Sequence, residues 1–158
     1  MSRVELRRAS LMEICHADEA LRTCDLMRAL AQGEAERLLG GSVARRFPKD
    51  AAVFRQGDEG WSAFLVLRGE VRLTSGHEGV VFGVARKGDL FGESELVTQR
   101  TARGSSAITN GDADVVELPA PLLMEVGRGN RRLVDLVQQL HQSRSAATHE
   151  IAGFINRW

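Results

Sequence analysis

The stretch Gly88-Asp89-Leu90-Phe91-Gly92-Glu93, followed by Arg100 and Arg103, is the most informative part of this 158-residue chain. It has the form of a strand end, a glycine turn, a carboxylate and two cations. Glycine lets the backbone approach an anion closely, successive N–H groups form a nest for it, and an arginine fork binds two phosphate oxygens. Glu93 repels an anion, so its natural partner is a hydroxyl such as a ribose 2′-OH. The stretch predicts a ligand with both a phosphate and a sugar hydroxyl.

Two upstream segments agree with this interpretation. Residues 53–58, VFRQGD, form a hydrophobic piece that ends in a Gln-Gly-Asp turn, and residues 64–71, FLVLRGEV, form a hydrophobic strand followed by a glycine hairpin. In this order and at this approximate spacing, the three pieces resemble the cyclic-nucleotide-binding domain of the catabolite activator protein family and of cyclic-nucleotide-regulated kinases. The 88–93 stretch resembles that family's phosphate-binding cassette, and the resemblance covers roughly residue 24 to the C-terminus.

The resemblance implies cyclic AMP or cyclic GMP as the ligand, and no cofactor. It assigns the ligand to the cassette, to an arginine loop and to the part of the C-terminal helix that meets the base: Phe91, Gly92, Glu93, Ser94, Thr148 and His149. Two registers are open for the arginine. Arg103, followed by Gly104 and Ser105, has the spacing from Glu93 of the catabolite activator type, whereas Arg100-Thr101 matches the Arg-Ser/Thr-Ala pattern better but needs a shorter loop.

Two residues depart from the family pattern. Glu95 stands where the family has a small residue, and an unpaired, desolvated carboxylate at about 4 Å would oppose a phosphate by several kcal/mol. Gly104 stands at a serine or threonine position, so a hydroxyl is lost unless Ser105 replaces it. If Glu95 points to solvent or pairs with an arginine, the site survives. Two functions stay open: a cyclic-nucleotide sensor, and an adaptor that uses the same fold without nucleotide.

Helical and strand patterns occupy different parts of the chain. Apolar residues recur at helical spacing over residues 4–39, and short strand patterns separated by glycine turns follow at 43–47, 52–54, 63–67, 70–74, 80–85, 105–109 and 114–118. Such strands predict an antiparallel sandwich or barrel. We expect an α+β, mainly β fold: N-terminal helices at 1–40, a jelly-roll barrel of the cyclic-nucleotide-binding type at 41–121, and C-terminal helices at 122–158, ending in a long one.

The C-terminal segment carries a heptad pattern. Its members follow an unbroken 4-3-4-3 spacing and are Leu133, Val137, Leu140, Arg144, Ala147, Ile151, Phe154 and Trp158. This spacing is typical of a coiled-coil seam and predicts a homodimer through positions 133–154, with Arg144 setting the register. The alternative is an amphipathic helix packed on its own barrel, which the additional apolar residues at 134, 136 and 155 permit. In the resembling family this helix both forms the dimer and covers the base.

Composition excludes several other classes of protein. Acidic and basic residues balance at 21 each, so no overall field attracts nucleic acid or a membrane. No run approaches the roughly 20 apolar residues of a membrane span. Cys15 and Cys24 would lie about 13 Å apart on a continuous helix, too far for a disulfide, which fits reduced thiols in the cytoplasm. No motif predicts a metal site or an enzyme.

The end of the chain adds one expectation. Transcription regulators of the resembling family carry a helix-turn-helix domain after the long helix, and this sequence ends at Trp158. We therefore expect a stand-alone regulatory module that does not contact DNA directly. Its output would pass to a partner protein that the sequence does not identify.

Overall fold

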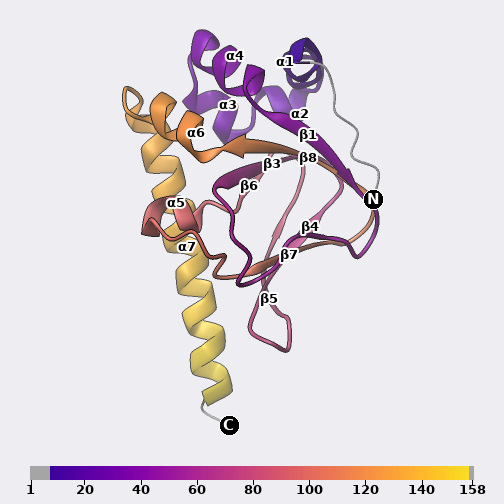
Figure 1. Ribbon diagram of the computed structural model, residues 1–158, viewed down its shortest axis with the longest axis vertical. Coiled ribbons are helices and arrows are strands. Elements are labelled where there is room, and N and C mark those ends of the chain that lie inside the picture. The colour runs from indigo at the N-terminus through magenta and orange to yellow at the C-terminus, as the bar shows by residue number, and fades with distance from the viewer. Residues whose placement is uncertain (1–7, 157–158) are drawn as a thin grey trace.

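The computed structural model describes residues 8–156, and Figure 1 shows their arrangement. Short helices come first: α1 (Arg8–Ala17), α2 (Glu19–Arg22), α3 (Asp25–Ala29) and α4 (Gln32–Gly40). The strands are β1 (Val43–Phe47), β2 (Ala52–Phe54), β3 (Ser62–Arg68), β4 (Val71–Ser75), β5 (Val80–Ala85), β6 (Leu90–Phe91), β7 (Ser106–Thr109) and β8 (Ala113–Pro119). Helix α5 (Ser94–Thr98) lies between β6 and β7, and α6 (Ala120–Gly127) and α7 (Arg131–Asn156) complete the chain.

The strands form two antiparallel sheets of four, in the orders β1-β8-β3-β6 and β2-β7-β4-β5. Strand β3 is buried on both faces, because its alternate side chains serve two cores. Phe64 and Val66 join an aromatic core between the sheets, while Leu65 and Leu67 join an aliphatic core beneath the helices. The predicted mainly β, α+β fold is confirmed, and the seven expected strands lie within one residue of their observed ends.

The N-terminal helical region is interrupted, because local caps end each helix. Asp18 caps α2 by accepting a hydrogen bond from the Leu21 N–H at 3.2 Å, and Cys24 takes an extended conformation (φ −66°, ψ 161°) before α3. The premise that Cys15 and Cys24 share one continuous helix is therefore wrong. Both are free thiols. Burial raises the pKa of Cys15 to about 11, with a smaller contribution from Cys24, so Cys15 stays protonated at neutral pH.

The start of α7 is pinned to the N-terminal helices. The Asn130 side chain accepts from the Leu133 N–H at 3.0 Å and donates to the Ala29 carbonyl at 2.6 Å and to Glu34 at 2.9 Å. From there α7 runs down one side of the molecule, past α5 (Figure 1). Among the described residues, no helix combines the length and apolar character that crossing a bilayer would need.

The first half of the predicted dimer seam faces the chain's own body. Leu133 is 1% exposed, and Val137 and Leu140 pack against the aliphatic core. Leu133, Val137 and Leu140 therefore pack within the chain, as the intrachain alternative predicts, because α3, α5 and α6 offer an apolar surface that this face of α7 covers. The intermolecular seam stays a prediction. Ala147 is half-buried, and the side chains of Ile151 and Phe154 lie outside the described part.

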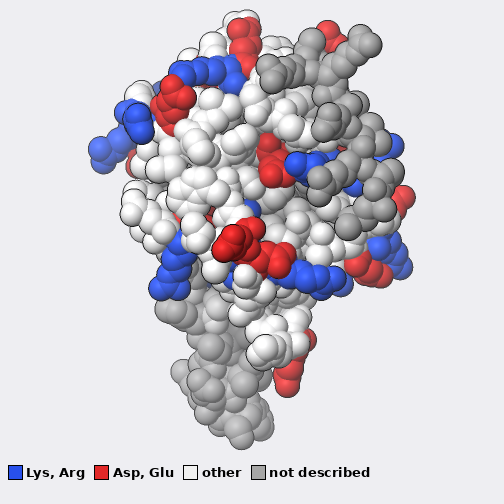
Figure 2. Space-filling view, viewed as in Figure 1, with Lys and Arg blue, Asp and Glu red and all other residues white. Residues whose placement is uncertain are grey.

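Charges on the surface are mixed in sign. On the face drawn in Figure 2, Lys and Arg side chains are interspersed with Asp and Glu side chains rather than gathered into one basic area. Several charged side chains form ion pairs between neighbouring strands of one sheet, such as Arg46 and Arg68 with Asp114. The visible face therefore offers no continuous track for a nucleic acid backbone.

Candidate ligand-binding site

The cassette is built on a glycine that the fold requires. Gly92 follows β6 with φ at +75°, a conformation that L side chains rarely adopt. A Cβ there would lie 3.1 Å from the Phe64 ring and 3.2 Å from the Phe54 ring. The chain therefore passes directly over the aromatic core before it enters α5. The core side of the cassette is fixed by these rings, and its other side faces α7.

A pocket of about 330 Å³ lies between the cassette, the β4–β5 hairpin and α7. It brings together segments that are far apart in sequence, and its lining residues are Ser75, Phe82, Ser94, Glu95, Arg100, Gly104, Ser105, His141, Arg144, Ser145 and Thr148. Five residues assigned to the ligand from the sequence line it: Ser94, Arg100, Gly104, Ser105 and Thr148. Its volume falls in the range of about 300–1,000 Å³ that is usual for small-molecule sites.

Other predicted site residues do not line this pocket. Phe91 is fully buried in the aromatic core, and Gly92 packs over the same rings. The backbone carbonyl of Thr101 accepts a hydrogen bond from the Gly60 N–H at 2.9 Å, and Thr101 itself is exposed. His149 belongs to α7, but its side chain lies outside the described part.

Glu93 connects the cassette to α7. Its carboxylate is 1% exposed, and Oε2 accepts a hydrogen bond from Arg144 Nη1 at 2.7 Å. Arg144 Nη2 donates to the Leu90 carbonyl at 2.7 Å, so the guanidinium holds both ends of the turn. Glu93 Oε1 is buried and has no donor among the described residues. Arg144, which the heptad pattern places in a dimer seam, thus pairs with a buried carboxylate of its own chain.

Arg103 lies inside the molecule rather than in the pocket. It is 3% exposed, and its guanidinium lies 4.2 Å above the Phe54 ring. Nη2 donates to the Ser62 carbonyl at 2.8 Å, and Nη1 donates to the Gly92 carbonyl at 3.0 Å. Gly60 makes room for it, since a Cβ on that residue would lie 2.7 Å from Nε. Arg103 is therefore a fixed, buried cation beneath the cassette.

Glu95 pairs with this cation, which is one of the two arrangements considered from the sequence. Glu95 is 5% exposed, and Oε2 lies 3.3 Å from Arg103 Nη1. Oε1 accepts a hydrogen bond from the Gly104 N–H at 2.9 Å. The carboxylate is thus neutralised by an arginine and held by a backbone donor of the arginine loop.

Arg100 has the opposite environment. Its side chain is exposed and lines the pocket, and it makes no hydrogen bond or ion pair with the side chains that the structure describes, residues 11–148. The two registers for the phosphate arginine therefore correspond to two different cations. Arg103 is buried and already paired with groups of the protein, whereas Arg100 faces the pocket from its rim.

Some pocket residues were not assigned to the ligand from the sequence. His141, Arg144 and Ser145 share one face of α7 with the predicted Thr148, and His141 Nδ1 lies 3.3 Å from the Ser94 hydroxyl. Their i, i+3, i+4, i+7 spacing is a signal that could have identified this face. No local pattern points to Ser75 and Phe82, because only the pairing of β4 with β5 brings that hairpin to the cassette.

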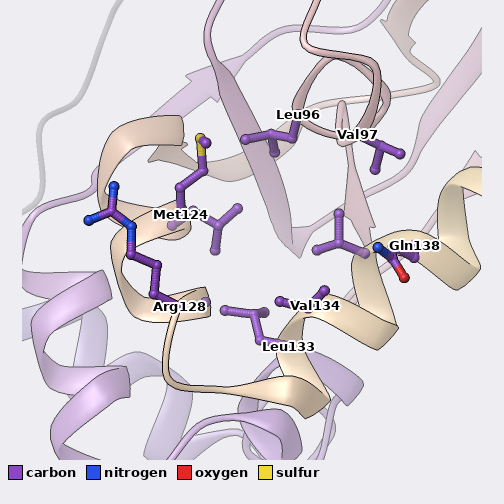
Figure 3. A pocket seen from close by; sticks show the side chains of 10 residues that line it. Leu96, Val97, Met124, Arg128, Leu133, Val134 and Gln138 are labelled. Atoms are coloured by element: carbon purple, nitrogen blue, oxygen red, sulfur yellow. The ribbon is translucent and has the colours of Figure 1, made fainter.

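An apolar groove, also of about 330 Å³, lies on another side of α5 (Figure 3). Leu96 and Val97 of α5 face Leu133, Val134 and Val137 of α7 across it, and Met124 of α6 completes its rim. Helix α5 thus meets α7 through apolar side chains here and through Ser94 and His141 at the polar pocket. A shift of the cassette would change both contacts.

Comparison with known proteins agrees with this geometry. A curated relative, the "Cyclic AMP receptor protein" of Thermus thermophilus, is 32% identical over 96 residues, which cover 59% of this chain and 44% of the relative. The chain therefore spans less than half the length of that protein. Among solved structures, cAMP-bound PfPKA-R has a TM-score of 0.78 at 15% identity and covers 92% of this chain and 48% of its own.

A further structure comes from a cAMP-independent protein kinase A of Trypanosoma brucei. It is a triple mutant of the regulatory subunit with cAMP bound in the A site, and one of its substitutions replaces Glu with Ala. The TM-score is 0.73 at 17% identity, over 92% of this chain and 52% of that one. At these identities both solved structures establish the fold alone. The family model described as "Cyclic nucleotide-binding domain" matches residues 44–130, more than half of the sequence. The chain therefore belongs to the cyclic nucleotide-binding domain family.

Proposed function

We propose that this chain is a regulatory module in which the presence or absence of a ligand at the cassette determines the position of α7. Through its position, α7 signals to a partner protein. The observation that carries the proposal is the ion pair between Glu93 and Arg144. The carboxylate that the family resemblance assigns to a ribose is the group that anchors the helix. The function is binding and regulation rather than catalysis.

The proposed ligand is a cyclic mononucleotide, cyclic AMP or cyclic GMP, with no cofactor. The buried Glu93 Oε1 supports this, because a ribose hydroxyl would supply the donor that this oxygen lacks among the described residues. The hydroxyls of Ser94 and Thr148 and the cation of Arg100 line the same pocket. A ligand shifts α7 only if it binds two helix positions with different affinity, and a hydroxyl that shares Glu93 with Arg144 creates such a difference.

A second function is favoured by the pairing of Glu95 with Arg103 and the Gly104 N–H. These donors suit a phosphate, and a protein carboxylate already satisfies them. The chain would then be an adaptor that presents α7 to a partner without nucleotide. The cAMP-independent regulatory subunit of Trypanosoma brucei supports this alternative, because it has a similar fold.

Thermal melting separates the two functions. The wild-type chain is melted alone and with cyclic AMP, cyclic GMP or a cyclic dinucleotide in excess. A ligand at 100 times its dissociation constant stabilises the folded state by about 2.7 kcal/mol, which raises Tm by several degrees in a domain of this size. A rise with one nucleotide supports the sensor. The absence of any rise at millimolar concentration supports the adaptor.

The two arginine registers are separated by the same assay. Arg100→Ala removes an exposed cation, so we expect unchanged stability, and weaker nucleotide binding by this variant would assign the phosphate to Arg100. Arg103→Ala also leaves Glu95 buried without its cation, so we expect a clear fall in stability, of about 3 kcal/mol. If Arg103→Ala keeps its stability and alone loses affinity, the phosphate contacts Arg103 directly.

We also propose that the chain forms a homodimer and is located in a reducing compartment. The dimer would use the distal part of the heptad seam, Ala147, Ile151 and Phe154, because the proximal part is committed within the chain. The free thiols of Cys15 and Cys24 support the expected cytoplasmic location.

A further inference from the structure

We propose that Glu95 is a built-in occupant of the cassette's anion site, so that the free chain holds its own carboxylate where a ligand's phosphate would bind. The identity of that ligand as a cyclic nucleotide rests on the proposed function. The anion site itself is defined by protein groups alone: the Gly104 N–H and the guanidinium of Arg103.

The contacts of Glu95 are those of a bound anion. Its two oxygens take separate donors, a glycine N–H of the arginine loop at 2.9 Å and Arg103 Nη1 at 3.3 Å. A guanidinium and a loop N–H are the donors that proteins offer to phosphate oxygens. Here the group between them is a side chain from α5, three residues beyond Gly92.

The cation of this site, Arg103, is held in place by several contacts, whereas the anion, Glu95, can be replaced by another anion. Arg103 is held by the Ser62 carbonyl, the Gly92 carbonyl and the Phe54 ring, and its guanidinium packs directly against the backbone of Gly60. Glu95 is carried by α5, a helix of five residues followed by Gln99 in the left-handed region. Releasing Glu95 therefore requires a movement of α5 and leaves Arg103 in place.

The charges at the site favour a phosphate that replaces Glu95 over a phosphate that binds beside it. Glu93 pairs with Arg144 and Glu95 pairs with Arg103, so these four buried or nearly buried groups sum to zero. A phosphate monoanion added beside Glu95 would leave a buried negative charge without a partner, which is strongly unfavourable. If the phosphate replaces Glu95, the balance is restored, and the carboxylate moves toward the exposed Arg100 at the pocket rim.

Replacement of Glu95 by an anionic ligand would change the contacts between α5 and α7. Helix α5 contacts α7 through Ser94 and His141 on one side of Glu95, and on the other side Leu96 faces Val137 of α7 across the apolar groove. An anion that expels Glu95 moves α5, and α5 moves against both contacts. Glu95 thus sets the threshold at which an anionic ligand can alter the helix.

The test uses inorganic phosphate as the probe and Glu95→Ala as the variant. Wild type, Glu95→Ala and the control Glu13→Ala, which removes an exposed carboxylate on α1, are melted in sodium phosphate and in sodium chloride of equal ionic strength. We expect Glu95→Ala to gain at least about 3 °C more from phosphate than the other two proteins, as for a ligand at roughly ten times its dissociation constant. Equal gains for all three would overturn the inference.

The Gly104 amide gives a local readout in ¹⁵N NMR. In Glu95→Ala its resonance should move with phosphate and saturate, whereas in wild type it should stay in place. Glu95→Gln keeps the occupant's shape and should not respond. If Glu95→Ala does not fold, Glu95→Ser, which also opens the site, takes its place. A folded small-residue variant whose Gly104 amide ignores phosphate would overturn the inference.

Cyclic AMP titrations separate this inference from the proposed function. Removing Glu95 should tighten binding of cyclic AMP by about tenfold to a hundredfold, the range of one charge-assisted contact. Binding by wild type with no gain in Glu95→Ala would keep the sensor and overturn the role of Glu95. A phosphate response of Glu95→Ala without nucleotide binding in either protein would keep the role of Glu95 and overturn the sensor.

Discussion

At the scale of single residues, Gly60 and Arg103 fit together only because one of them has no side chain. The buried guanidinium lies under the Gly60 backbone, and a Cβ there would lie 2.7 Å from Nε and 3.0 Å from Nη2. The Gln-Gly-Asp turn that precedes Gly60 helps to hold this loop, since the Gly57 N–H donates to the Arg103 carbonyl at 2.8 Å. The loop and the arginine are therefore one structural unit.

Gly60→Ala should weaken this unit. The added methyl group has to displace a guanidinium that is already bound to Ser62 and Gly92, so we expect a loss of about 1–3 kcal/mol in the free energy of unfolding. Urea unfolding measures it. Gly111→Ala is the matched control, because nothing lies within 4 Å of its added Cβ. Equal stability of the two variants would mean that Arg103 is not held as described.

At the scale of elements, α7 is joined to the cassette by polar contacts of Arg144 and His141 and to the aliphatic core by apolar residues. Arg144 contacts Glu93 and the Leu90 carbonyl, while Leu133, Val137 and Leu140 cover the core. The apolar contacts lie on the N-terminal side of Arg144. Within residues 141–148 of α7, His141 and Arg144 make polar contacts with the cassette.

Arg144→Met should loosen the distal part of α7 selectively. Glu93 would lose its ion-pair partner while remaining buried, so we expect destabilisation of about 3 kcal/mol and faster amide hydrogen exchange at residues 141–148 than at 133–140. Arg132→Met, an exposed position of the same helix, should change neither quantity. Uniform exchange along α7 in the Arg144 variant would contradict the anchoring role of this pair.

Three neighbouring strands of one sheet, β1, β8 and β3, carry a charge cluster with a defined pH dependence. Burial raises the pKa of Asp114, but hydrogen bonds from Arg46 of β1 and Arg68 of β3 outweigh it, so the pKa lies below its ordinary value. A carboxyl group with a lowered pKa in the folded state stabilises the fold above its unfolded pKa of about 3.9. That contribution is lost as the pH falls further, through the folded pKa.

Asp114→Asn should therefore reduce the fall in the free energy of unfolding that the wild type shows as the pH is lowered toward the pKa of this carboxyl group. Because Arg46 and Arg68 are more than half exposed, screening limits the loss at pH 7 to about 0.5–1 kcal/mol. Below about pH 4 the variant and wild type should converge. Urea unfolding between pH 2.5 and 7 measures the free energy of unfolding of the variant and the wild type across this range, with Glu13→Gln as the control. A constant difference at every pH would show that charge does not cause the effect.

At the scale of the whole molecule, the heptad pattern divides into two parts. Its proximal members pack against the chain's own aliphatic core, and we propose that its distal members, from Ala147 onward, contact a second copy. Figure 1 shows α7 continuing beyond the barrel. A helix that extends past its own core has an apolar stripe that another copy of the same helix can cover.

Two aspartate substitutions separate these parts. Val137→Asp should lower the melting temperature sharply, because it introduces a charge into intrachain packing. Phe154→Asp should leave the melting temperature of the body nearly unchanged and dissociate the dimer. Light scattering at tens of micromolar measures the mass. A monomeric wild type at that concentration would contradict the dimer.

The sequence by itself determined the parts of this protein that depend on local pattern. Period-two strands, glycine turns and the order of three motifs identified the mainly β fold, the family and the place of the cassette, since backbone preferences and side-chain alternation act over a few residues. The interruptions between α1 and α4 were missed because caps such as Asp18 compete with a continuous apolar pattern. Strand β6, of two residues, is too short to show a period.

Only the tertiary structure decided which charges meet. Arg103 and Arg100 are three positions apart and equal in chemistry, yet one lies on Phe54 in the core and the other on the pocket rim. Arg144 fits a seam in the sequence, but it binds Glu93, 51 positions earlier. The choice depends on which buried carboxylate remains to be neutralised and where Gly60 leaves room. Such constraints arise only when distant segments exclude water together, because the cost of an unpaired charge is set by burial and not by sequence spacing.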